Sequence, residues 1–303
     1  MSPPPALVHG ALVLVAVIYG LNYVFIKDLL DQVPTTRAWV FIRIATATLL
    51  ILPIVWLARR PLPPRDTWWW LLLAAILGVV CNQVLFAEGL QRTTPGHSAV
   101  INSAIPVLTL CFAVLAHQEQ FTIRKVAAIG VALSGVFILL AERLTVAGPS
   151  LQGSLVGDLL TLGNATSFSI FLVLMRKLGR RVDPLMTTAV CFLFGTVIIG
   201  AYGAPALDAA NVQALLSPTV LPLALFGILA CTVLVYFLNN WALHHTHSSQ
   251  VALYIYLQPV VATGLSMHLG WDDPSPRFYL ATALVFSGLL LQSFGERRPA
   301  DIP

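Results

Sequence analysis

Charged residues are scarce in this chain. Only 10% of its 303 residues are Asp, Glu, Lys or Arg, while 57% are hydrophobic and the mean hydropathy is +0.83. Because a soluble domain carries about a quarter charged residues, this composition excludes an ordinary soluble protein. The chain has room for about ten membrane-spanning helices of about 20 residues each, which leaves none for a separate soluble domain.

The sequence also lacks the usual motifs of catalysis and metal binding. Its four cysteines are scattered without metal-ligand spacing, and we interpret them as core residues. The phosphate-binding Gly-x-x-x-x-Gly-Lys-Ser/Thr motif and the metalloprotease His-Glu-x-x-His motif are missing. We therefore expect neither an enzyme nor a cofactor. The Lys and Arg residues are confined to a few loops, which indicates membrane orientation rather than nucleic-acid binding.

The two halves of the chain match at a constant offset. Pairs of identical or similar residues separated by 153 positions include Thr93 with Thr246, Pro106 with Pro259, Glu119 with Asp272, and Gly135 with Gly288. Because each half holds five hydrophobic spans, the second copy must enter the membrane in the opposite direction. We predict an all-α integral membrane fold of ten transmembrane helices, with inverted five-helix repeats at 1–147 and 148–303 around a central cavity. Many carriers are built this way.

Clusters of Pro, Gly and charge separate the hydrophobic segments. The expected spans are 6–26, 37–57, 68–90, 97–116, 124–141, 153–175, 184–203, 217–238, 247–270 and 277–295. Lys and Arg on one side of these spans outnumber those on the other by eleven to five, so both termini are expected in the cytoplasm. The first span lacks the positive leader of a signal peptide, and we expect it to be retained.

The string from Ile18 to Lys27, followed by Pro34 and Phe41-Ile42-Arg43, resembles the opening of the EamA family in the drug/metabolite transporter superfamily. The later parts of both repeats, around Pro106 and Pro259, are similar to that family too. The resemblance implies a carrier in a bacterial-type cytoplasmic membrane, with a small-molecule substrate and the lipid bilayer as its partners. It implies export or exchange of metabolites, with aromatic and other neutral amino acids as the best-known cargo. We expect no nucleic-acid partner and no obligate protein partner.

Polar side chains inside spans are candidates for a substrate-binding lining, because a polar group in a dry apolar core needs a partner. These candidates are Tyr19, Asn22, Tyr23, Asn82, His97, Asn164, Asn240, Gln250, Tyr254 and Gln258. Hydrogen bonding between helices is the alternative interpretation for Asn22, Asn82 and Asn164. In the ninth span Gln250, Tyr254 and Gln258 form a stripe beside Pro259, whereas the matching stretch beside Pro106 is mostly apolar. The cavity is therefore expected to be asymmetric.

For ionisable residues near the spans, the sequence leaves more than one interpretation of their role open. Arg43 lies within the second span and is interpreted as structural, with direct substrate binding as the alternative. Glu88 is either a proton-coupling carboxylate or an ion-pair partner of Arg92. His244, in a His-rich tract, is a candidate proton-sensitive gate or an interfacial residue, and metal binding is not expected there.

Four further residues are interpreted as structural: Pro106, Pro259, Glu119 and Asp272. Glu119 and Asp272 follow matching spans of the two repeats. We expect each carboxylate to cap the N-terminus of the next helix.

Overall fold

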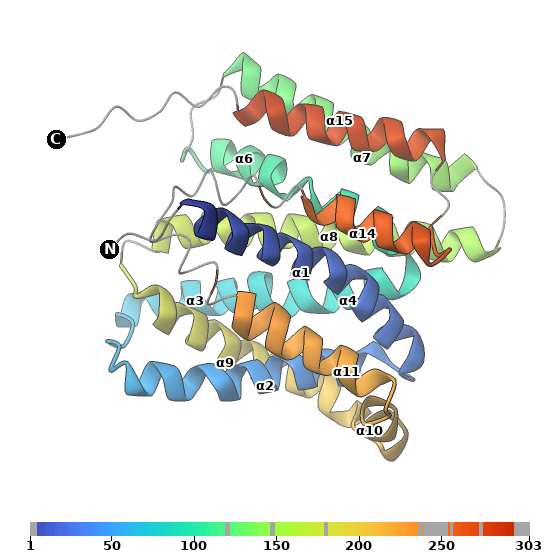
Figure 1. Ribbon diagram of the computed structural model, residues 1–303. Helices are drawn as coiled ribbons and strands as arrows, with labels where there is room; N and C mark the ends of the chain where they lie inside the picture. The colour runs from blue at the N-terminus through green and yellow to red at the C-terminus, as the bar shows by residue number, and fades with distance from the viewer. Residues whose placement is uncertain are drawn as a thin grey trace.

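The computed structural model describes residues 5–118, 122–145, 149–178, 181–235, 238, 254, 257–272 and 275–293. Within these ranges every regular element is a helix and no strand occurs. The long helices lie side by side as one bundle, and α1 begins on the side where α15 ends (Figure 1).

The first half of the chain forms α1 (Pro5–Gln32), α2 (Thr36–Leu57), the short 3-10 helix η1 (Arg65–Thr67), α3 (Trp68–Ala75), the π-helical segment η2 (Ile76–Cys81), α4 (Asn82–Arg92), α5 (Pro95–Asn102), α6 (Ile105–Leu115) and α7 (Ile123–Thr145). The second half forms α8 (Pro149–Leu178), α9 (Pro184–Gly203), the 3-10 helix η3 (Ala204–Ala206), α10 (Ala209–Leu215), α11 (Val220–Leu225), the π-helical segment η4 (Phe226–Leu234), α14 (Leu257–His268) and α15 (Pro276–Ser293).

Several of these helices are long enough to cross a membrane. Seven are also sufficiently apolar, and the pair Ala209–Leu215 and Val220–Thr232, bent by 79°, would make eight. α14 and α15 lie in the expected ninth and tenth spans, but most of 247–256 lies outside the described residues. The chain is therefore a multi-pass helical membrane protein, and the count of ten stays a prediction.

Helix starts follow from short polar caps and proline. The Thr94 side chain accepts a hydrogen bond from the His97 amide at the start of α5, and Asp183 accepts one of 3.0 Å from the Met186 amide at the start of α9. A proline stands in the first turn of both helices. A side-chain acceptor satisfies an amide that has no partner inside the helix, so these turns fix where the spans begin.

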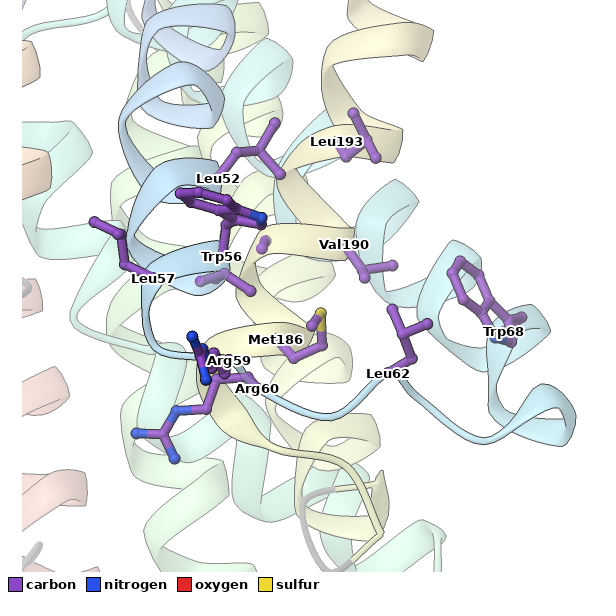
Figure 2. A pocket seen from close by; sticks show the side chains of 12 residues that line it. Leu52, Trp56, Leu57, Arg59, Arg60, Leu62, Trp68, Met186, Val190 and Leu193 are labelled. Carbon is purple, nitrogen blue, oxygen red and sulfur yellow. The ribbon is translucent and has the colours of Figure 1, made fainter.

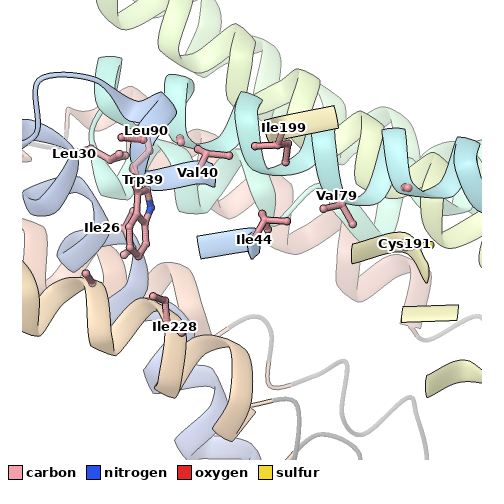
Figure 3. Close-up of a cluster of buried hydrophobic side chains, with 14 of the residues drawn as sticks. Ile26, Leu30, Trp39, Val40, Ile44, Val79, Leu90, Cys191, Ile199 and Ile228 are labelled. Atoms are coloured by element: carbon pink, nitrogen blue, oxygen red, sulfur yellow. The ribbon is translucent and has the colours of Figure 1, made fainter. Parts of the chain in front are cut away.

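The main apolar core joins helices of both halves. Trp39 of α2 is only 1% exposed, and Figure 3 shows its ring among Ile26, Leu30, Leu90 and Ile228. Gly227 provides room for this ring, because a Cβ there would lie 3.0 Å from two of its carbons. Such packing fixes α1, α2, α4 and η4 around one another.

A second contact between the halves joins α7 and α15, which lie against each other along their length in Figure 1. A Cβ at Gly135 would lie 2.5 Å from the Ala281 carbonyl oxygen, and one at Gly288 would lie 2.6 Å from the Ala128 carbonyl oxygen. The two contacts are reciprocal, since Gly135 and Gly288, and likewise Ala128 and Ala281, are separated by the offset of 153 residues. Small residues permit this close backbone approach between membrane helices.

Candidate functional site

Five polar or weakly polar side chains from four elements meet inside the bundle. We call them the central polar cluster: Tyr19 and Tyr23 of α1, Arg43 of α2, Asn102 of α5 and Cys231 of η4. The Arg43 guanidinium interacts electrostatically with Tyr19 and Cys231, and Tyr19 interacts with Tyr23. Because η4 belongs to the second half of the chain, the cluster lies where the two halves meet.

Asn102 and Cys231 are the members of this cluster that the sequence analysis missed, and Asn102 is the more polar of the two. It is 6% exposed, and the Tyr23 hydroxyl interacts with its amide, yet neither Nδ2 nor Oδ1 makes a hydrogen bond of good geometry. α5 ends at Asn102, and Pro106 has no N–H to donate to the Asn102 carbonyl four residues earlier. An asparagine four residues before a proline in an apolar span was the available signal. Buried polar atoms without partners are rare in proteins, so this site is suited to a polar solute.

Two of the first-span candidates, Tyr23 and Asn22, are buried in or beside the central polar cluster. Tyr23 is 8% exposed and packs edge-on against Phe86, with ring centroids 5.7 Å apart. Asn22 is 6% exposed, and its Oδ1 has no hydrogen-bond partner. Asn22 therefore adds a second buried amide acceptor beside the cluster, on the same turn of α1.

The ninth-span candidates are only partly described. The Gln258 backbone carbonyl lies 3.0 Å from the place of a Cβ on Gly20, so α14 is in close contact with α1 at that point. The Tyr254 hydroxyl instead bonds His9 Nδ1 at 2.7 Å, near the start of α1. His9 and Asn22 are separated by about 20 Å along the helix axis. Gln250, Asn240, His244 and Glu119 lie outside the described residues.

Asn164 and Asn82 join two helices. Asn164 Nδ2 donates to the Asn82 carbonyl at 2.8 Å, and the Ser167 hydroxyl donates to the Leu77 carbonyl at 2.8 Å. Both acceptors lie in or beside η2, where the π-helical turn interrupts the regular α-helical hydrogen bonds. This geometry favours the helix-joining interpretation of Asn164, with α8 supplying donors to the irregular backbone of the third span.

Glu88 lies in a polar network at the end of α4. Its carboxylate accepts from the Thr36 hydroxyl, from the Tyr202 hydroxyl at 3.1 Å, and from Arg92 at 2.5 Å. The Arg37 guanidinium lies 4.9 Å from the centre of the Tyr202 ring. This geometry favours the ion-pair interpretation of Glu88, and the network also links the ends of α2, α4 and α9.

Two ionisable side chains lie near the first turn of α5: His97 of that helix and Asp272 from the second half of the chain. Asp272 accepts a 2.8 Å hydrogen bond from the Gly96 amide, whereas the Ser275 hydroxyl accepts from Phe278 at the start of α15. The expectation that Asp272 caps the next helix in the chain is therefore corrected, because it caps a helix of the other half. His97 Nδ1 lies 3.3 Å from Asp158 Oδ2.

A groove among the described residues lies elsewhere. It has a volume of about 810 Å³ and is lined mainly by α2 and α9, with Trp56, Val190 and Leu193 along it and Arg59 and Arg60 at one end (Figure 2). Trp56 is 78% exposed although it lies on a membrane-spanning helix. The groove therefore opens sideways towards lipid and is distinct from the central polar cluster. Among the described residues no group of three His, Cys, Asp or Glu side chains is placed to hold a metal ion.

A bundle of apolar helices with a polar cluster between its halves is typical of membrane transporters. The model of the EamA-like transporter family matches residues 7–141 and again residues 155–294. The chain belongs to this family, which is part of the drug/metabolite transporter superfamily.

Relatives of known name are similar over nearly the whole chain. An uncharacterized transporter of Bacillus subtilis (strain 168), YwfM, is 25% identical over 297 residues, which are 96% of this chain and 95% of that protein. The uncharacterized inner membrane transporter YedA of Escherichia coli (strain K12) is 27% identical over 299 residues, covering 95% and 90%. A crystal structure of another protein matches 96% of this chain and 98% of its own with a TM-score of 0.59 at 17% identity, which shows the fold alone.

Proposed function

We propose that this protein is a secondary carrier that exports or exchanges small amphipathic metabolites, with aromatic or other neutral amino acids as first candidates. The observation that carries the proposal is the central polar cluster, with the buried, unpartnered side-chain amide of Asn102 and the unpartnered Oδ1 of Asn22 beside it. A solute that donates and accepts hydrogen bonds there would satisfy atoms that the protein leaves without partners.

The chemistry of the cluster favours a solute with a carboxylate and an apolar or aromatic part. Arg43 supplies a positive charge and planar donors that match a carboxylate. Asn102 and Asn22 supply both donors and acceptors for an amino group, and Tyr19 and Tyr23 supply ring faces. This division would let the charged head of an amino acid and its side chain contact different walls.

Two inverted five-helix repeats, 1–147 and 148–303, are part of the proposal. Three observations support them: the family model matches the chain twice, the glycine contacts between α7 and α15 are reciprocal, and π-helical segments fall at corresponding places. Residues 76–81 of η2 shifted by 153 become 229–234, which lie inside η4. The repeats would alternate around the cluster to expose it to one side of the membrane at a time.

We further propose that both termini lie in the cytoplasm and that the membrane is a bacterial-type inner membrane. The bias of Lys and Arg supports this orientation. Under it, the corner where α4 meets α5 faces outward. The proposal includes no catalytic step and no cofactor, since movement of the solute needs only binding and conformational change.

Uptake into proteoliposomes tests the carrier. Purified protein is reconstituted and exposed to labelled phenylalanine, methionine and threonine, with empty liposomes as the reference. We expect saturable uptake of at least one amino acid, and competition by the unlabelled compound. Arg43→Gln should raise the half-saturating concentration at least tenfold, because a charge-assisted bond to a carboxylate contributes about 1.5–3 kcal/mol.

Arg37→Gln is the matched control, because Arg37 is exposed and contacts the Tyr202 ring rather than the cluster. Its half-saturating concentration should match the wild type. Equal uptake by protein-containing and empty liposomes, with the protein shown to be folded, would exclude these amino acids as cargo. Equal kinetics of wild type and Arg43→Gln would remove Arg43 from the solute site.

A further inference from the structure

A buried pair of ionisable side chains lies outside the proposed solute site. Asp158 of α8 is completely buried, with 0% of its side chain exposed. One of its carboxylate oxygens accepts from the Thr93 hydroxyl, and the other lies 3.3 Å from His97 Nδ1. A carboxylate without water needs compensating charge or donors, and an ionisable residue in a membrane bundle is a functional-site candidate by default.

The imidazole of His97 is nearly as deeply buried, with 9% of its side chain exposed. It lies against the Phe278 ring, with centroids 5.3 Å apart, and despite the short distance to Asp158 its Nδ1 makes no hydrogen bond of good geometry. Histidine ordinarily gains or loses a proton near neutral pH. With an added proton, His97 offers Asp158 a positive charge and a donor. Without it, the ring offers no charge to balance the carboxylate.

The pair joins the parts of the bundle that would have to separate if this end opened. Thr93 ends α4, His97 is on the first turns of α5, and Asp158 is on the first helix of the second half. His97 and Asn102 are on the same short helix, about 7.5 Å apart along its axis. A movement of α5 at His97 therefore also moves the Asn102 side chain of the central polar cluster.

Several charged groups on the elements around α5 have partners of their own. Lys27 pairs with Asp31 on α1 at 3.0 Å, Arg92 pairs with Glu88 on α4 at 2.5 Å, and Asp272 accepts from the Gly96 amide. Arg277 of α15, beside Phe278, also has an interaction partner, and Asp158 has a further one besides Thr93 and His97. The His97 imidazole is the basic group that lies 3.3 Å from the Asp158 carboxylate.

We propose that His97 and Asp158 form a proton-sensitive gate that holds the outer end of the bundle closed when a proton is bound. The inference rests on the proposed carrier function and on its orientation. As the outer end closes, one proton taken from the outer water is held between the imidazole and the carboxylate. As it opens, water solvates both groups and the proton returns to that water. The bound proton thus favours the closed outer end, and acid on the outer side makes opening less favourable.

The first test measures opening of the outer end without any solute. Asn22→Cys is introduced after the four native cysteines are replaced by serine, and intact cells are treated with a membrane-impermeant maleimide at about pH 5.5 and about pH 8, on either side of the ordinary histidine range. We expect labelling to be several-fold slower at the acid pH, after correction for thiol ionisation with an exposed cysteine in the same background. His97→Gln and Asp158→Asn should remove this difference.

Asp31→Asn is the matched control, because Asp31 belongs to an exposed ion pair at the same end. It should keep the wild-type pH difference. His97→Gln leaves the Thr93–Asp158 bond in place, so it keeps the test decisive if Asp158→Asn fails to fold. The inference would be overturned by equal pH dependence with and without His97→Gln, or by no labelling of the Asn22→Cys protein at either pH.

A second test separates the gate from a structural role. In proteoliposomes, the wild type should exchange labelled for unlabelled solute several-fold more slowly at about pH 5.5 than at about pH 8, on either side of the ordinary histidine range, whereas His97→Gln should exchange at similar rates at both. A variant that is only less stable would exchange more slowly at both pH values. If the wild type transports none of the amino acids, the proposed cargo fails and the labelling test alone decides on the gate. If the wild type transports them at the same rate at both pH values, the carrier stands and the gate fails.

Discussion

At the scale of single residues, two buried asparagines make opposite use of their side chains. Asn164 donates from Nδ2 to a backbone carbonyl at 2.8 Å, whereas both polar atoms of the Asn102 side chain lack a hydrogen-bond partner. They are 3% and 6% exposed, so burial does not separate them. We therefore assign Asn164 to the stability of the folded bundle and propose Asn102 for solute binding.

Alanine substitutions test this contrast. Asn102→Ala should leave the unfolding midpoint close to that of the wild type, because no hydrogen bond of good geometry is lost, but should reduce solute uptake at least tenfold. Asn164→Ala should destabilise the protein by about 1–3 kcal/mol, because the part-buried Asn82 carbonyl loses its donor. Thermal unfolding in detergent and uptake in proteoliposomes measure the two effects.

The opposite pattern would contradict the assignment. If Asn102→Ala lowered the unfolding midpoint as much as Asn164→Ala and kept normal uptake, Asn102 would be a structural residue. Asn102→Asp retains the shape of the side chain but adds negative charge. It should also impair uptake of a carboxylate-bearing solute, by placing like charge beside it.

Sequence alone could predict only part of this residue-level picture. The spacing of Tyr19 and Tyr23 along one helix placed them together, and the polarity of Arg43 inside a span drew attention to it. The pairing of His97 with Asp158 was not predicted, because contact between residues 61 positions apart depends on packing between helices. His97 was expected in the solute lining, and that role stays a prediction; the structure adds that it lies beside the Asp158 carboxylate.

At the scale of elements, the contact between α7 and α15 depends on individual glycines. Gly135 faces the backbone of α15, while Gly130 of the same helix has no neighbouring atom within 4 Å of an added Cβ. Gly135→Ala should destabilise the protein by about 1–3 kcal/mol, because the extra methyl group forces the helices apart. Gly130→Ala should be neutral or stabilise by about 0.5–1 kcal/mol, because alanine favours the helix.

Unfolding of the two variants in detergent, followed by circular dichroism at several temperatures, measures the difference. Gly288→Ala should behave like Gly135→Ala, since its added Cβ would meet Ala128 and Ala132 in the reciprocal contact. Equal midpoints for Gly130→Ala and Gly135→Ala would show that α7 and α15 do not approach as closely as described.

Element boundaries were predictable where local chemistry sets them. Proline and a capping side chain mark the starts of α5 and α9, and both starts lie within a few residues of the expected ones. The π-helical segments η2 and η4 and the end of α5 at Asn102 were not predicted. A π-helical turn depends on how neighbouring helices satisfy the displaced backbone groups. The hydrophobic pattern of a span contains no such information.

At the scale of the whole molecule, three separate sets of polar groups join helices of the two halves. The Glu88 network links α2, α4 and α9, the His97–Asp158 pair links α5 to α8, and the central polar cluster lies between η4 and helices of the first half. Opening one end of the bundle while keeping the other closed requires that such contacts break separately. The cluster then becomes accessible from one side only, as alternating access needs.

The orientation of the bundle can be tested with cysteines at its two ends. Ala209 at the start of α10 and Leu62 between α2 and η1 are both exposed. The loop containing Leu62 also carries Arg59, Arg60 and Arg65, and positively charged loops are retained in the cytoplasm. In a background without native cysteines, an impermeant maleimide should label Ala209→Cys on intact cells and Leu62→Cys only after permeabilisation. The reverse result would mean that the bundle has the opposite orientation in the membrane. Protons from outside would then reach the Leu62 end first, and the His97–Asp158 pair would respond to cytoplasmic pH.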